Sequence, residues 1–183
     1  MHNHLGAIDR GNPSGKRDYA IIMLAARLGL RCIDIKRLMF SNFNWSENYL
    51  EFSQSKTSRA VRLPILKDVG WAIIDYIKNG RPVSDSPYVF LRHLAPIEPF
   101  SDEDRLHQII QKYMRLAKLP VSDKKKIGMH SLRHTLATSL MENHTPIADI
   151  AGILGHQSTE SMPTYLKSSL GLLRECALSP EVE

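Results

Sequence analysis

Residues 130–165 read HSLRHTLATSLMENHTPIADIAGILGHQSTESMPTY and concentrate the chemically active side chains of this chain. The stretch contains His130 and Arg133 near its start, His156 after a glycine, and Tyr165 at its end. Imidazole and guanidinium groups bind and neutralise phosphates, and a tyrosine oxygen can attack a phosphate. The combination predicts phosphoryl transfer through a covalent tyrosine ester, carried on short helices.

The size and composition of the chain are those of one globular domain. It has 183 residues, of which 43% are hydrophobic and 23% are charged. A chain of this kind builds a hydrophobic core without disulfides or structural metals. The net charge is +5 and the excess lies in the first half of the sequence, which is compatible with a polyanionic partner.

The cysteine and hydropathy patterns predict a cytoplasmic protein. Cys32 and Cys176 stand far apart, in no metal-binding or redox spacing, so both are expected to be reduced. The longest apolar run, residues 19–26, is too short to span a bilayer, and no signal peptide precedes it. We therefore expect no contact with a membrane.

The first part of the sequence predicts two helices followed by a small sheet. Residues 1–16 are rich in residues that interrupt regular structure and are expected to be irregular. Helical spacing of apolar residues begins at Arg17, stops at Gly29 and resumes over residues 32–40. Alternating apolar residues over 43–63, with two polar interruptions, predict a three-stranded antiparallel meander.

The remainder is predicted to be mainly helical. A helix is expected over residues 66–77 and a short strand over 88–91. The next helix is expected to be capped by Ser101, to have the acidic first turn Asp102-Glu103-Asp104, and to end near Ala117. Further helices are expected after Gly128, from Thr145-Pro146 with a break at 152–157, and around Tyr165. The predicted fold class is therefore α+β, mainly α, with one small three-stranded antiparallel sheet.

The helix after Gly128 is a candidate anion site. His130 and Arg133 are three residues apart and would lie one above the other near its N-terminus. Free backbone N–H groups and the helix dipole favour a phosphate at the same end. His134 would lie one turn deeper, as a packing and supporting residue. Taken singly, these residues also fit ordinary structural roles, such as a capping histidine or a surface arginine, and Tyr165 alone fits a half-buried core position.

Together these residues resemble the signature of the tyrosine recombinase, or phage integrase, family. The family's C-terminal motif is H-x-L-R-H, then L-G-H, then a tyrosine nine residues later, and an earlier G-L-R box and a lysine in a sheet turn precede it. The C-terminal motif is matched by His130-Ser131-Leu132-Arg133-His134, Leu154-Gly155-His156 and Tyr165. The G-L-R box is matched by Gly29-Leu30-Arg31, with Asp34 three residues on. The sheet-turn lysine is matched by Lys56-Thr57, ahead of Arg59 and Val61-Arg62-Leu63-Pro64. The resemblance covers residues 17–177 and implies the DNA breaking-rejoining catalytic fold of that family.

The resemblance implies roles for three cations. Arg31 and Arg133 would bind the non-bridging oxygens of the scissile phosphate and stabilise the charge of the pentavalent transition state. Lys56, on the sheet turn, would protonate the departing 5′ oxygen. Sheet-edge cations are commonly only solvated, and Arg59 and Arg62 stand close by as alternatives.

The resemblance also implies the nucleophile and its partners. Tyr165 would attack the phosphorus, giving a 3′-phosphotyrosyl link and a free 5′-hydroxyl. His130 would assist proton transfer at the nucleophile, and His156 would donate a hydrogen bond to the phosphate. Because the ester stores the bond energy, no metal, ATP or other cofactor is expected. Asp34 and His134 would support their neighbours.

Double-stranded DNA is the partner that the resemblance implies, with a homotetramer on DNA and a monomer in its absence. Residues 17–183 would form the catalytic domain, and the family's N-terminal DNA-binding domain is expected to be absent. Pro163, two residues before Tyr165, indicates that the tyrosine helix starts late or is kinked. The amphipathic segment 170–178 would pack on its own core or on a neighbouring protomer.

Three other functions stay open from the sequence. A type IB topoisomerase-like enzyme would use the same chemistry to relax supercoils, and a non-catalytic DNA-binding module would keep only the fold. A metal hydrolase could use His130, His134 and His156, but their spacing provides no carboxylate on the same face.

Overall fold

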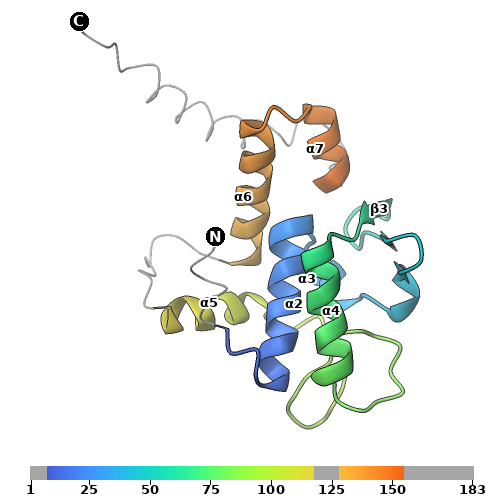
Figure 1. The fold of residues 1–183 in the computed structure, drawn as a ribbon, viewed down its shortest axis with the longest axis vertical. Coiled ribbons are helices and arrows are strands. Elements are labelled where there is room, and N and C mark those ends of the chain that lie inside the picture. Colours follow the sequence, from blue (N-terminus) through green and yellow to red (C-terminus); the bar gives the residue numbers. More distant parts are fainter. Residues whose placement is uncertain (1–7, 118–127, 155–183) are drawn as a thin grey trace, which may run out of the picture.

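A computed structural model describes residues 8–117 and 128–154 of the chain. Helix α2 (Pro13–Leu28) runs through the middle of the molecule and packs against α4 (Lys67–Asn79) and α6 (Met129–Glu142) (Figure 1). The small sheet lies at the edge of this helical body (Figure 1). The predicted fold class, a mainly helical α+β domain with one small antiparallel sheet, is confirmed within the described residues.

Helix α2 begins at Pro13, four residues before the predicted start at Arg17. The Asn12 side chain accepts a hydrogen bond of 2.7 Å from the backbone N–H of Gly15, and Pro13 follows as the first helical residue. This pairing of a side-chain cap with a proline is a strong helix start, so the expectation that residues 1–16 are irregular is wrong for 13–16. The helix ends at Gly29, as predicted, in the left-handed conformation with φ 67°.

The helix predicted over residues 32–40 is shorter in the structure. Helix α3 (Cys32–Lys36) stops early, and a 3₁₀ turn, η1 (Phe40–Asn42), follows. Between them the backbone pairs elsewhere: the Leu38 carbonyl accepts from Val89, and the Phe40 N–H donates to the carbonyl of residue 87. These bonds to a distant segment replace the i to i−4 bonds that a longer helix would need. The strand predicted over 88–91 forms only isolated bridges.

The three-stranded antiparallel meander is confirmed. Strands β1 (Phe43–Asn44), β2 (Tyr49–Ser53) and β3 (Ala60–Pro64) pair in the order β1-β2-β3. Leu50 lies opposite Leu63, and Phe52 lies opposite Val61. All four side chains are buried while their neighbours along the strands are exposed or half-buried, so one face of the sheet packs on the core.

The prediction of a helix capped by Ser101 is wrong, because α5 (His107–Leu116) begins six residues later. The Asp104 carboxylate accepts hydrogen bonds from the Ser101 backbone and hydroxyl, and it pairs with Arg92 at 2.9 Å. The buried Lys36 ammonium binds the backbone carbonyls of residues 101 and 102. The acidic residues and carbonyls that would have formed a first helical turn are therefore engaged by side chains from other segments.

The last two described helices are α6, which follows Gly128 as predicted, and α7 (Ile147–Leu154). Helix α7 continues through Gly152, so the predicted break at 152–157 is wrong for residues 152–154; the rest of that range lies outside the described residues. Ile150 and Leu154 are buried against Ala137 of α6. This packing keeps the turn helical despite the low helix propensity of glycine.

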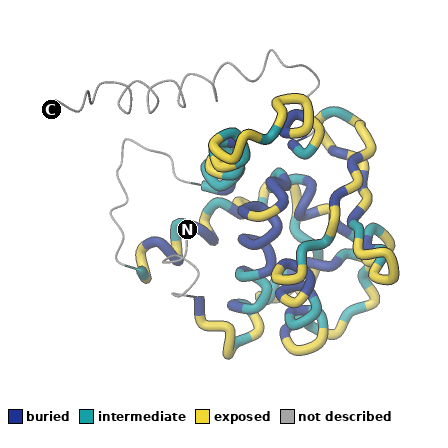
Figure 2. The backbone as a smooth tube through the Cα atoms, turned by 45° about the horizontal axis from the view of Figure 1, so that its top comes forward, coloured by how far each residue is buried: buried dark blue, intermediate teal, exposed yellow. Residues whose placement is uncertain are grey.

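The core is built around α2, in which every residue from 20 to 26 is buried; buried residues gather in the middle of the molecule (Figure 2). The buried faces of α4, α5 and the sheet complete one continuous apolar cluster, and α6 with α7 forms a smaller one. Over the described residues, no helix combines the length and the apolar character that crossing a membrane requires.

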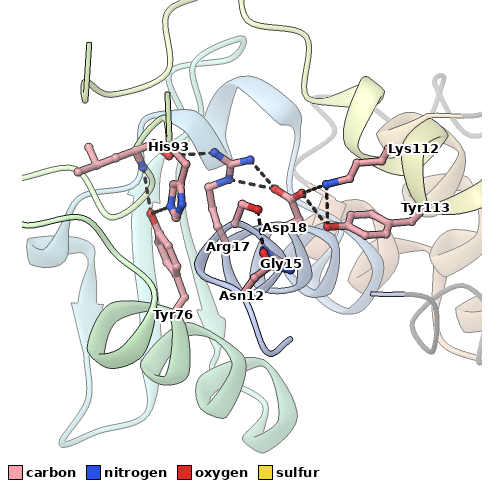
Figure 3. A network of polar contacts seen from close by, with 10 residues as sticks. Asn12, Gly15, Arg17, Asp18, Tyr76, His93, Lys112 and Tyr113 are labelled. Atoms are coloured by element: carbon pink, nitrogen blue, oxygen red, sulfur yellow. Dashed lines mark hydrogen bonds and ion pairs between the residues drawn. The ribbon is translucent and has the colours of Figure 1, made fainter. Parts of the chain in front are cut away.

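A buried carboxylate joins α2 to α5 (Figure 3). Asp18 is 1% exposed and forms an ion pair of 2.7 Å with Arg17. The Tyr113 hydroxyl donates to the second carboxylate oxygen over 2.9 Å, and the Lys112 ammonium lies 3.5 Å from it. Burial, together with the negative charge of Asp18, raises the pKa of Tyr113. Arg17 also donates to the Leu91 carbonyl, so the Arg17–Asp18 pair connects α2 to α5 and to the segment at Leu91.

Replacing Asp18 with asparagine is expected to lower the free energy of unfolding by about 3–5 kcal/mol, because the neutral amide removes the charge that pairs with the buried Arg17 and puts an NH₂ group in place of one of the two acceptor oxygens. Urea denaturation measures the change. Asp75→Asn is the matched control, since Asp75 pairs with Lys16 but its side chain is 38% exposed; it should cost about 0–1 kcal/mol. Equal losses in the two variants would contradict a structural role for the buried carboxylate.

Candidate active site

The site begins at the corner between α2 and α3. Gly29 ends α2 with a positive φ, and a Cβ at this position would lie 2.8 Å from a methyl carbon of Leu154. Only glycine fits both the backbone conformation and the close approach. Leu30 is buried, and Arg31 follows it in extended conformation directly before α3.

Arg31 is held from two sides. Its Nη1 donates to Oε1 of Gln54 over 2.7 Å and lies 4.0 Å from Oδ2 of Asp34. Asp34 is buried, and its Oδ1 accepts a 2.8 Å hydrogen bond from the backbone N–H of Ser55. Its Oδ2 has no hydrogen-bond partner among the described residues and faces the Arg31 guanidinium. Asp34 thus connects α3 to the turn after β2.

Lys56 stands on that turn, between β2 and β3. The Gln54 carbonyl accepts from the N–H groups of Thr57 and Ser58, and the Gln54 N–H donates to the carbonyl of Arg59. Ser58 has a positive φ of 53°, which closes the turn. Lys56 is exposed at the tip of this closed turn, where an ammonium group reaches a ligand without first leaving a buried partner.

Arg133 is in a different environment from Arg31. It lies in the second turn of α6, is 3% exposed, and donates to the backbone carbonyls of Gly29 and Leu154. These carbonyls belong to the ends of α2 and α7. Arg133 therefore joins three helices as well as facing the candidate site.

These residues meet at one cavity of about 330 Å³. Its lining residues are Leu30, Arg31, Cys32, Ile33, Lys56, Met129, His130 and Arg133. Four of the predicted site residues thus come together from the α2–α3 corner, the β2–β3 turn and α6. The cavity combines three cations and an imidazole with apolar walls, an arrangement suited to a phosphodiester. The predicted site residues His156 and Tyr165 lie outside the described residues.

The two histidines of α6 contact each other. The rings of His130 and His134 meet edge to face with centroids 4.4 Å apart. The part of His130 that faces the protein is desolvated although much of the ring is exposed, and this desolvation lowers its pKa; the charges of His134, Arg133, Arg31 and Lys56 lower it further. Neutral imidazole is the form that accepts a proton, so the surroundings of His130 keep it ready to act as a base at neutral pH.

The titration midpoint of His130, followed by NMR, is expected below about 6.5, the value of an unperturbed histidine. With a lowered pKa, the folded state binds fewer protons than the unfolded chain at acidic pH. The free energy of unfolding therefore keeps the full contribution of neutral His130 above about pH 6.5 and loses it as the pH falls toward the folded-state pKa. Lys56→Ala should raise the midpoint by removing a neighbouring positive charge. A peptide of residues 128–136 provides the reference, and a midpoint at or above the peptide's would contradict the proposed environment.

Gln54 is the residue at this site that the sequence motifs did not identify. It is 3% exposed and follows Leu50 and Phe52 in the buried phase of the strand alternation. A glutamine at a position where the alternation requires an apolar residue is a signal that could have identified it, since buried polar groups require partners.

The comparison with protein families agrees with the motifs. The family described as "Phage integrase family" matches residues 2–170. The chain belongs to the phage integrase family.

A relative from Sinorhizobium fredii (strain NBRC 101917 / NGR234), named putative integrase/recombinase y4rF, is 32% identical over 174 residues. The match covers 95% of this chain and 40% of the relative, so the chain spans less than half the length of that integrase-family protein.

Two solved structures share the fold. The crystal structure of XerA recombinase has a TM-score of 0.75 at 22% identity and covers 98% of this chain and 62% of its own. The Tn1549 transposon integrase in complex with transposon right end DNA has a TM-score of 0.73 at 18% identity, covering 96% and 63%. These likenesses confirm the tyrosine recombinase fold predicted from the motifs.

Proposed function

We propose that this chain carries the catalytic centre of a tyrosine-type site-specific DNA recombinase. The observation that supports this most is the single cavity lined by Arg31, Lys56, His130 and Arg133. These residues are far apart in the sequence and belong to separate elements, yet each has the chemical group that the family's reaction requires. A non-catalytic DNA-binding module has no need of such convergence.

In the proposed reaction, the Tyr165 oxygen attacks the scissile phosphorus while the bond from phosphorus to the 5′ oxygen breaks. His130 takes up the phenolic proton, and Lys56 gives a proton to the leaving 5′ oxygen. Arg31 and Arg133 stabilise the negative charge that grows on the non-bridging oxygens. The products are a 3′-phosphotyrosyl ester and a free 5′-hydroxyl, and attack by another 5′-hydroxyl reverses the sequence.

Because bond energy is kept in the ester, rejoining requires neither ATP nor a metal ion in this scheme. His156 would donate a hydrogen bond to the phosphate. In the structure, Leu154 directly precedes the Gly155-His156 pair, and its carbonyl accepts from Arg133. Leu154, the last described residue before this pair, thus contacts an arginine that lines the cavity, which supports the proposed role.

The proposed partner is double-stranded DNA, with a homotetramer on DNA and a monomer in its absence. The net charge of +5 favours a polyanion, and the structurally similar Tn1549 integrase was solved with transposon end DNA. The proposed catalytic domain comprises the body that begins with α2. We expect its DNA binding to weaken as salt concentration rises, because phosphate contacts release counterions.

The test is covalent trapping. The protein is incubated with nicked duplexes of randomised sequence. Cleavage close to the nick releases a short fragment that carries the new 5′-hydroxyl, and the loss of this fragment prevents rejoining. A DNA-linked species that survives denaturation is expected, with the nucleotide on Tyr165 by mass spectrometry, and with equal yield in EDTA. Tyr165→Phe should give none. Attachment to another residue, or a requirement for a divalent metal, would refute the proposed function.

The same preparation separates recombination from supercoil relaxation. A recombinase joins ends from two different DNA molecules, whereas a type IB topoisomerase-like enzyme rejoins each end to its own strand. Joint molecules between two labelled duplexes are therefore expected, and relaxation of plasmid DNA without joint molecules would contradict the recombinase assignment.

A further inference from the structure

Gln54 is a buried amide beside the candidate site, in contact with Arg31. It follows β2 directly and only 3% of its surface is exposed. Its backbone already closes the β2–β3 turn, since its N–H and carbonyl bond to Arg59, Thr57 and Ser58. The side chain also reaches beyond that turn, and these longer-range contacts require a separate explanation.

The side-chain contacts determine the orientation of the amide. Oε1 accepts from Nη1 of Arg31 over 2.7 Å and from the Thr57 hydroxyl over 3.0 Å. A guanidinium only donates, so the atom facing it is the amide oxygen. The amide nitrogen then points to the Leu154 carbonyl, to which it donates over a longer distance of 3.5 Å. Both ends of the amide are thus used.

These contacts link the two arginines of the site. Arg133 donates to the same Leu154 carbonyl that Gln54 approaches. Arg31, Gln54, Leu154 and Arg133 therefore form a continuous chain of donors and acceptors across the α2–α3 corner, the sheet turn and the end of α7. A displacement of one member changes the separation of the two guanidinium groups.

We propose that Gln54 is a positioning residue that holds the Arg31 guanidinium in register with Arg133, so that both reach the same phosphate. This inference rests on the proposed recombinase function. It requires a neutral amide. A carboxylate would still accept from Arg31, but its negative charge would reduce the positive charge available to the phosphate. Its second oxygen would face the Leu154 carbonyl, and neither oxygen could donate a hydrogen bond to the other.

The experiment compares two substrates in the covalent trapping reaction. One has an ordinary phosphodiester, and the other has a methylphosphonate at the cleaved position, where a methyl group replaces one charged oxygen. Arg31 stabilises negative charge on that group, so a variant with a misplaced Arg31 loses less on the neutral substrate. A variant that is merely less well folded loses the same factor on both.

Gln54→Leu is expected to reduce cleavage of the phosphodiester by about 10- to 100-fold, the range expected when a charge-assisted positioning contact is lost. On the methylphosphonate the loss should shrink to about threefold or less. Gln54→Glu should show the same pattern, and it provides the test if the leucine variant does not fold. Gln108→Leu is the matched control, since Gln108 is exposed on α5, and it should leave both rates unchanged.

Two results would overturn the inference while the wild-type protein still cleaves DNA. The first is that Gln54→Leu cleaves the phosphodiester at the wild-type rate. The second is that Gln54→Leu loses the same factor in rate on both substrates. If the wild-type protein formed no covalent adduct with either substrate, the proposed function would fail, and the role of Gln54 with it. The wild-type lane therefore distinguishes failure of the function from failure of this inference.

Discussion

Replacing Arg31 with alanine is expected to slow covalent DNA cleavage by about 10³- to 10⁵-fold, the effect of removing an arginine from a phosphoryl-transfer transition state. Its side chain is 20% exposed and lines the cavity, where it is held by Gln54 and faces Asp34. A planar guanidinium offers two parallel donors to non-bridging oxygens. Arg31→Lys keeps the charge but not this geometry, so it should recover only part of the rate.

Arg37→Ala is the matched control for this prediction. Arg37 directly follows α3 and forms an exposed ion pair with Asp102, so its removal should change the rate by no more than a few fold. Single-turnover cleavage with saturating protein measures both variants. Equal rates for Arg31→Ala and Arg37→Ala would show that the cavity is not where the phosphate is bound.

Lys56→Ala is expected to slow cleavage of ordinary DNA by about 10²- to 10⁴-fold, the range for loss of a general acid. The loss should disappear when the leaving 5′ oxygen is replaced by sulfur. A thiol is far more acidic than an alcohol (the cysteine thiol has a pKa of about 8.5), so a thiolate leaves without being protonated. Single-turnover rates on the two DNAs measure the ratio.

Arg59→Ala is the control for Lys56, because both are exposed cations of the same turn. Lys56 lines the cavity, whereas Arg59 is not among the described residues that line it. Arg59→Ala should therefore retain cleavage of ordinary DNA. If sulfur rescued Arg59→Ala in place of Lys56→Ala, the arginine would be the acid.

Arg31 and Arg133 have the same proposed role but different structural attachments. Arg133 is almost fully buried and donates to backbone carbonyls at the ends of two other helices. Removing it leaves buried acceptors unpaired and costs folding stability in addition to catalysis. The contacts described for Arg31 are with the side chains of Gln54 and Asp34 and not with helix-end carbonyls, so its substitution reports more directly on the chemistry.

Local rules predicted some elements well and failed at others for identifiable reasons. The alternation over residues 43–63 predicted the sheet, because a one-residue shift would expose Leu50 and Phe52. The acidic turn after Ser101 resembled a helix start, but Asp104 is bound by Arg92 and the nearby carbonyls by Lys36. Lys36 is distant in the sequence, and no local pattern could show that it reaches this loop.

The sequence by itself determined the residue types of the site, because motif spacing records which chemical groups the chain carries and in what order. It also determined the helix stop at Gly29, since a left-handed corner favours glycine. Only the tertiary structure decided that Arg31, Lys56, His130 and Arg133 line one cavity, and that Gln54 links the two arginines through the Leu154 carbonyl. Those relations depend on how α2, the sheet turn, α6 and α7 pack together, and packing between distant segments leaves no spacing in the sequence to read.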